Sequence, residues 1–169
     1  MGSYYQIDRF AGVNIYMNNK LTLEIVWWVS TFVLALLVIL PIYTSVGLDF
    51  MFYIENILSI VVFVTLARWL FLLRHTFFGW NKKVKVVILF LMIPLFFICY
   101  DNLIDFQAYI DEQDIMTIVK SLPNEDQLSM AKYIRYEYVF FGVAALMTII
   151  MTPFRIVISV WRQINKGTV

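Results

Sequence analysis

The chain has 169 residues, of which 62% are hydrophobic, 18% aromatic and only 15% charged. A soluble domain is usually about half apolar, with about a quarter of its residues charged. The apolar excess lies in four blocks, each long enough to cross a hydrocarbon core about 30 Å thick. This composition excludes a soluble globular domain and predicts one membrane domain. The net charge of +1 gives no reason to expect a nucleic-acid partner.

The first 24 residues are polar and aromatic, and we expect a cytoplasmic segment that lies in the membrane interface or docks on a partner. The domain 25–169 follows. Its four blocks are apolar on all faces, which predicts helices rather than the alternating strands of a barrel. The first block is too long for the apolar region of a signal peptide, so no cleaved leader is expected. The expected transmembrane ranges are 25–43, 50–73, 84–100 and 138–161.

The links between the blocks differ in charge. The link after the second block is basic, with Arg74, Lys82 and Lys83, whereas the link 101–137 is acidic. Most of the 13 basic residues fall on one side of the membrane, and the positive-inside rule makes that side cytoplasmic. All five tryptophans map to the same interface, a depth that suits their amphipathic rings. Both ends of the chain are therefore expected in the cytoplasm.

The acidic link 101–137 has apolar residues at helical spacing up to a break at Pro123. Pro123 discourages a helix through Leu122, and Asn124 can cap a new one. We therefore expect an all-α integral membrane protein whose third and fourth helices extend outward as an antiparallel hairpin. The hairpin would reach on the order of 25 Å, with its tip near 121–124. The alternative is two short amphipathic helices that lie flat on the outer leaflet.

Two arginines, Arg68 and Arg155, lie inside apolar blocks, each about two turns before the cytoplasmic end. A charge inside a membrane is costly and is a functional hypothesis by default. The functional interpretation is an anion site for a lipid phosphate, a quinone-like carbonyl or an acid of a partner. The alternative is that each long side chain extends its head to the interface. No acid of this chain is expected at matching depth, which favours the alternative.

Carboxylates gather at the outer side. Glu55 opens the second block, where the helix dipole stabilises a negative charge. Asp101 and Asp105 are four residues apart on one helical face and could join Glu55 to hold a hard cation. Their spacing is not diagnostic of a metal site, so a solvated acidic rim is expected. The chain has one cysteine, Cys99, and no disulfide, metal site, cofactor or catalytic residue is predicted.

The second block, from Glu55-Asn56 to Arg68, superficially resembles the second helix of a voltage-sensor domain. The fourth block departs from that family, because Arg135 and Arg155 are too far apart to form an arginine ladder. The chain also lacks the cysteine pairs of quinone-coupled disulfide enzymes and the histidines of four-helix cytochromes. No family is identified from these residues.

The expected function is a non-enzymatic small subunit or assembly factor of a larger membrane complex, bound through helix faces and the outer hairpin. An oligomeric transporter, channel or proton-conducting component is the alternative, with Glu55, Arg68 and Arg155 along the path. A lipid-modifying enzyme would need a nucleophile or metal site that the sequence does not offer. Anionic lipid at the cytoplasmic face is a further expected partner. Abundant Ile, Phe, Tyr, Asn and Lys point to a bacterial inner membrane.

Overall fold

The computed structural model describes residues 4–73, 76, 79 and 81–165, with side chains from residue 21 onward. The long helices are α1 (Tyr4–Val46), α2 (Tyr53–Leu72), α3 (Lys82–Gln113) and α4 (Asn124–Asn165), and the short 3-10 helices are η1 (Gly47–Asp49) and η4 (Ile115–Thr117). The four long helices are long and apolar enough to cross a membrane. The prediction of an all-helical protein with four candidate transmembrane helices is therefore confirmed.

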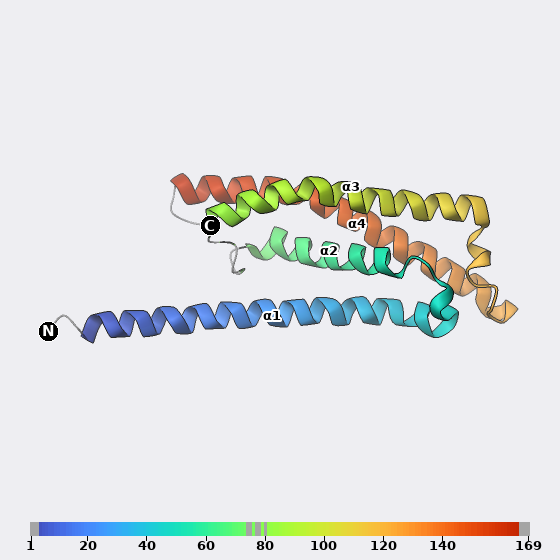
Figure 1. Ribbon diagram of the computed structural model, residues 1–169, viewed down its shortest axis with the longest axis horizontal. Coiled ribbons are helices and arrows are strands. Elements are labelled where there is room, and N and C mark those ends of the chain that lie inside the picture. The colour runs from blue at the N-terminus through green and yellow to red at the C-terminus, as the bar shows by residue number, and fades with distance from the viewer. Residues whose placement is uncertain (1–3, 74–75, 77–78, 80, 166–169) are drawn as a thin grey trace.

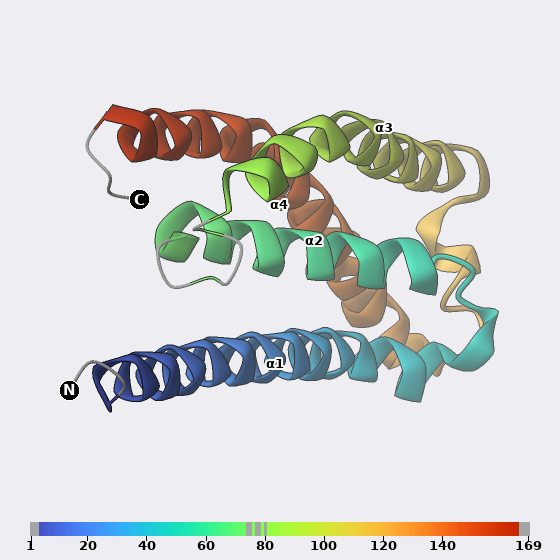
Figure 2. The same ribbon diagram turned by 60° about the vertical axis from the view of Figure 1, so that its left-hand side comes forward.

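The helices lie side by side, with α2 between α1 and the crossed pair of α3 and α4 (Figure 1). Figure 2 shows that α4 runs obliquely, from near the end of α1 to a position beside α3. Most contacts between helices join α4 to α2 and to α3, while α1 packs mainly on α2. α1 and α3 begin at one end of the molecule, where α2 and α4 end. We call this end, which carries Lys82 and Lys83, the basic end. The opposite end, where the acidic link 101–137 joins α3 to α4, is called the acidic end.

Three of the helices are longer than a bilayer requires. α1 has 43 residues, α3 has 32 and α4 has 42. At 1.5 Å per residue they are about 65, 48 and 63 Å long, whereas the hydrocarbon core is about 30 Å thick. The expected separate segment of 24 residues is instead continuous with α1, which begins at Tyr4. Arg74 and Trp80 of the basic link lie outside the described residues.

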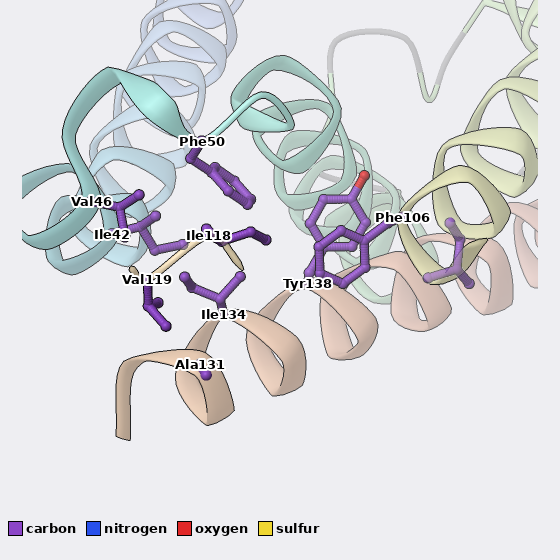
Figure 3. Close-up of a cluster of buried hydrophobic side chains, with 10 residues drawn as sticks. Ile42, Val46, Phe50, Phe106, Ile118, Val119, Ala131, Ile134 and Tyr138 are labelled. Carbon is purple, nitrogen blue, oxygen red and sulfur yellow. The ribbon is translucent and has the colours of Figure 1, made fainter. Parts of the chain in front are cut away.

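The largest cluster of buried apolar side chains lies at the acidic end (Figure 3). Five segments contribute to it: the end of α1, the link after α1, α3, the link before α4, and α4. Its members are Ile42, Val46, Phe50, Leu103, Phe106, Ile118, Val119, Ala131, Ile134 and Tyr138. The rings of Phe106 and Tyr138 stack with their centroids 3.8 Å apart. We call residues 101–137, which include most of this cluster, the acidic-end cap.

The link between α3 and α4 differs from the predicted one. α3 ends at Gln113, because Asp114 has a φ of 64° and its side chain accepts a hydrogen bond from the Met116 amide. α3 therefore stops well before the tip expected at 121–124. Residues 118 and 119 fold back into the buried cluster. α4 begins at Asn124, directly after Pro123, as the sequence predicted.

α3 and α4 approach each other closely at Gly142. A Cβ atom added there would lie 2.9 Å from Cδ1 of Leu103. Glycine is the residue that lets two helices come this close in a membrane bundle. The glycine of α4 therefore packs within the bundle at this position, against α3.

Candidate functional site

Arg68 of α2 forms an ion pair with Glu24 of α1. Its Nη1 donates to Oε2 of Glu24 at 2.7 Å, and the two side chains are 6% and 11% exposed. The guanidinium also lies 5.2 Å from the ring centroid of Trp27, one turn along α1. The expectation that no acid of this chain lies at the depth of Arg68 was wrong. Glu24 was missed because it stands at the polar edge of the first apolar block.

Arg155 of α4 contacts the end of α2. Its Nε donates to the backbone carbonyl of Leu70 at 3.0 Å. The last carbonyls of a helix have no partner within the helix, and a cation there also interacts favourably with the helix dipole. Arg155 therefore caps the carboxyl end of α2. This role was not predicted from the sequence. Arg68 and Arg155 have different partners, one on α1 and one on α2.

Lys85 joins the beginning of α3 to the end of α4. The residue is 1% exposed, and its Nζ donates to Oγ of Ser159 at 2.9 Å and to Oε1 of Gln163 at 3.1 Å. Ser159 and Gln163 are one turn apart on the same face of α4. From the sequence, Lys85 was grouped with the basic residues between the second and third blocks, and no partner was predicted for it. The available signal was the helical spacing of two polar residues, Ser159 in the fourth block and Gln163 just after it.

Asn56 of α2 and Glu137 of α4 form a buried polar pair at the acidic end. Nδ2 of Asn56 donates to Oε2 of Glu137 at 2.7 Å, and the two residues are 0% and 8% exposed. Three buried oxygens in this region have no hydrogen-bond partner among the described residues: Oδ1 of Asn56, Oε1 of Glu137 and Oε2 of Glu55. Sequence reasoning missed Glu137, because it sits at the boundary between the acidic link and the fourth block.

The expected acidic rim is divided in the structure. Glu55 is half-buried in the first turn of α2, while Asp101 and Asp105 are exposed on α3. No ion pair or hydrogen bond joins Glu55 to Asp101 or Asp105 among the described residues. No group of three or more His, Cys, Asp or Glu residues that could hold a metal ion occurs within the described part of the chain.

Among the grooves on the molecular surface, one lies between α2 and α3 and one lies between α3 and α4 at the acidic end. The α2–α3 groove has a volume of about 400 Å³ and an apolar lining that includes Trp28, Leu66, Trp69, Ile88 and Leu95. The α3–α4 groove lies in the acidic-end cap and has a volume of about 560 Å³. Its lining is mixed: Gln107, Ile110, Asp111, Arg135, Tyr136 and Val139. The first groove suits apolar chains, and the second can take a ligand with both polar and apolar groups.

The polar contacts described above join helices in pairs: α1 to α2, α2 to α4, and α3 to α4. They hold the bundle together at both of its ends. Two buried oxygens of the Asn56–Glu137 pair have no hydrogen-bond partner in the described part of the chain. The chain matches no protein-family model, and neither a curated protein nor a solved structure matches it.

Proposed function

We propose that the protein is a non-enzymatic small subunit or assembly factor of a larger membrane protein complex. Both ends of the chain lie in the cytoplasm in this proposal, and the acidic-end cap faces outward from a bacterial inner membrane. Support for the orientation comes from charge, because basic residues gather at one end of the helices and acidic residues at the other.

The α3–α4 groove is the observation that carries the proposal. All of its lining residues except Val139 belong to the cap, beyond the expected apolar spans, where we expect the surface to meet water instead of lipid. Arg135 and Tyr136 line it, and Tyr136 is 69% exposed. Tyrosine and arginine are enriched among the residues that anchor protein interfaces. An exposed aromatic beside a groove in an aqueous region favours a docking site for another polypeptide.

The docking surface continues along α4 toward the start of the helix. Leu128 is 58% exposed and Lys132 is also exposed. Residues 128, 132, 135 and 139 share one helical face, because they are three or four positions apart. The packing of α3 against α4 at Phe106 and Tyr138 supports an outward helical hairpin that presents this face. A partner would meet a rigid surface about three turns long.

Anionic lipid is the second partner that we propose, at the basic end. Lys82 and Lys83 are exposed at the beginning of α3. Trp69 and Ile88 line the α2–α3 groove, and Ile88 lies between one and two turns beyond these lysines. Basic residues at the cytoplasmic surface attract anionic headgroups. An acyl chain of the same lipid can occupy the apolar groove.

A photo-crosslinking amino acid at position 136 tests the proposed complex. Irradiation of intact membranes is expected to join this position to a larger membrane protein, which mass spectrometry then identifies. The matched control places the same amino acid at Leu48, which is 84% exposed at the same end of the molecule. Adducts only to lipid or to a second copy of the chain at position 136 would contradict the proposal.

An oligomeric proton-conducting component is the second candidate function, and the burial of Glu137 between α2 and α4 favours it. One copy has too few helices to enclose a pore, so a symmetric oligomer would be required. Proton flux into liposomes that contain the purified protein discriminates between the two functions. The candidate predicts flux that Glu137→Gln abolishes, and the absence of flux from every oligomer would eliminate it.

A further inference from the structure

We propose that Glu137 is a reversible proton-binding site, and that Asn56 holds its carboxyl group in both protonation states. This inference does not depend on the partner proposed above, and it stands whether or not the protein conducts protons.

The surroundings of Glu137 do not suit a permanent charge. The residue is 8% exposed, and its one hydrogen bond to a described side chain comes from the neutral amide of Asn56. No lysine or arginine within the described part of the chain forms an ion pair with it. A buried carboxylate without a cation is costly, and such a group takes up a proton instead.

The unpartnered oxygens favour a proton over a metal ion. Among the described residues, no donor contacts Oε1 of Glu137 or Oδ1 of Asn56. One proton on the carboxyl group supplies the missing donor. A hard cation such as calcium needs six or more oxygens, and no group of three or more acidic, cysteine or histidine ligands that could hold a metal occurs among the described residues.

Asn56 is suited to both states of the carboxyl group because its amide carries a donor and an acceptor. In the ionised state, Nδ2 donates to Oε2 of Glu137, which is the observed contact. After protonation, the amide can rotate by half a turn about its broad terminal torsion. The carboxyl O–H of Glu137 then donates to Oδ1 of Asn56. One hydrogen bond joins α2 to α4 in each state, so proton uptake does not separate the helices.

The titratable neighbours come from α2, α3 and α4. They are Glu55 on α2, Cys99 and Asp105 on α3, and Tyr133 and Tyr138 on α4, and each interacts with Glu137 or with the adjacent Tyr138. The hydroxyl of Tyr133 donates to the Val38 carbonyl and that of Tyr138 to the Asn102 carbonyl. Neither hydroxyl therefore donates to Glu137 in this arrangement. Glu55 is half-buried in the first turn of α2, next to Asn56 in the chain.

Infrared difference spectroscopy across a pH titration of the protein in lipid nanodiscs tests the proposal. A carboxyl C=O band is expected to grow as the pH falls, to disappear in Glu137→Gln and to persist in the matched control Glu55→Gln. In Asn56→Leu the band should shift, because the carboxyl group loses its hydrogen-bond partner. A band that survives in Glu137→Gln, or a response to sodium or calcium in place of pH, would overturn the proposal.

A second measurement needs no substitution and so does not depend on whether a variant folds. Selective ¹³C labelling of glutamate carboxyl groups moves their C=O bands to lower frequency and leaves those of aspartate in place. The proposal expects a buried, pH-dependent band that moves with the glutamate label. A titrating band that moves only with labelled aspartate would contradict it.

Discussion

Arg68 has a buried carboxylate as its partner and an aromatic ring beside it, a combination that makes a cation tolerable in the apolar part of a bundle. The ion pair with Glu24 is charge-assisted at 2.7 Å, and the ring of Trp27 adds a cation–π contact at 5.2 Å. Removing one partner of such a pair leaves the other charge buried and unpaired. The pair therefore fixes the register of α1 against α2.

We predict that Glu24→Gln lowers the free energy of unfolding by about 3 kcal/mol, the lower end of the range for breaking a buried pair from one side. The double variant Glu24→Gln/Arg68→Met should recover part of this loss, because no unpaired charge remains. Denaturation in mixed detergent micelles measures both values. Glu125→Gln, at an exposed position on α4, is the matched control. A single variant as stable as the wild type would contradict the structural role of the pair.

The sequence alone identified Arg68, Arg155 and Glu55 as notable residues, because charges in apolar blocks are rare. It did not reveal their partners. Glu24 and Arg68 are 44 positions apart, and Asn56 and Glu137 are 81 positions apart. Such contacts depend on the rotation of each helix about its own axis. Hydropathy does not define that rotation when a helix is apolar on all faces.

At the scale of the helices, the end of α2 depends on α4. Arg155 donates to the Leu70 carbonyl in the last turn of α2, just before the basic link. Lys85 makes a comparable connection from α3 to Ser159 and Gln163. The basic end of the bundle is therefore held by cations that reach across to a neighbouring helix.

We predict that Arg155→Leu speeds amide hydrogen exchange in the last turn of α2, because the Leu70 carbonyl loses its donor and the turn frays. Arg155→Lys should restore part of the protection, since an ammonium can approach the same carbonyl with a less favourable geometry. Exchange detected by mass spectrometry gives the comparison, and the middle of α4 serves as an internal reference. Unchanged exchange at residues 70–72 in Arg155→Leu would show that Arg155 does not cap α2.

The packing of α3 against α4 in the acidic-end cap can also be tested directly. A cysteine pair at Gln107 and Tyr136, which line the same groove, should be joined by a short bifunctional maleimide in a Cys99→Ala background. A pair at Gln107 and Ser129 is the control, because residue 129 is about two turns nearer the start of α4. Cross-linking of the control pair alone would contradict the packing of α3 against α4.

The four long apolar helices could be predicted because hydropathy and length are local properties of the chain. Helix ends were predicted less well. Pro123 correctly marked the beginning of α4. The end of α3 was placed too far along, because a left-handed φ at Asp114 has no clear signature in an aspartate. The continuation of α1 to Tyr4 was also missed, since polar residues there resemble a separate segment.

At the scale of the whole molecule, the two ends differ in character. The acidic end has the largest apolar cluster, the α3–α4 groove and the Asn56–Glu137 pair. The basic end has cations that join neighbouring helices. The apolar α2–α3 groove, which Trp69 and Ile88 line, opens beyond these cations toward the middle of the bundle. This asymmetry supports a protein that engages a polypeptide on one side of the membrane and lipid on the other. Composition could predict the membrane class, but no sequence pattern identified the partner.

The proposed docking surface depends on the orientation of the bundle, because only the end that faces outward can meet a partner on that side of the membrane. Single cysteines at Glu125 and at Lys83, in a Cys99→Ala background, can be labelled in intact cells with a membrane-impermeant maleimide. Both positions are exposed in the structure. Labelling is expected at residue 125 in intact cells, and at residue 83 only after the membrane is permeabilised. Labelling at residue 83 but not at residue 125 in intact cells would contradict the proposed orientation.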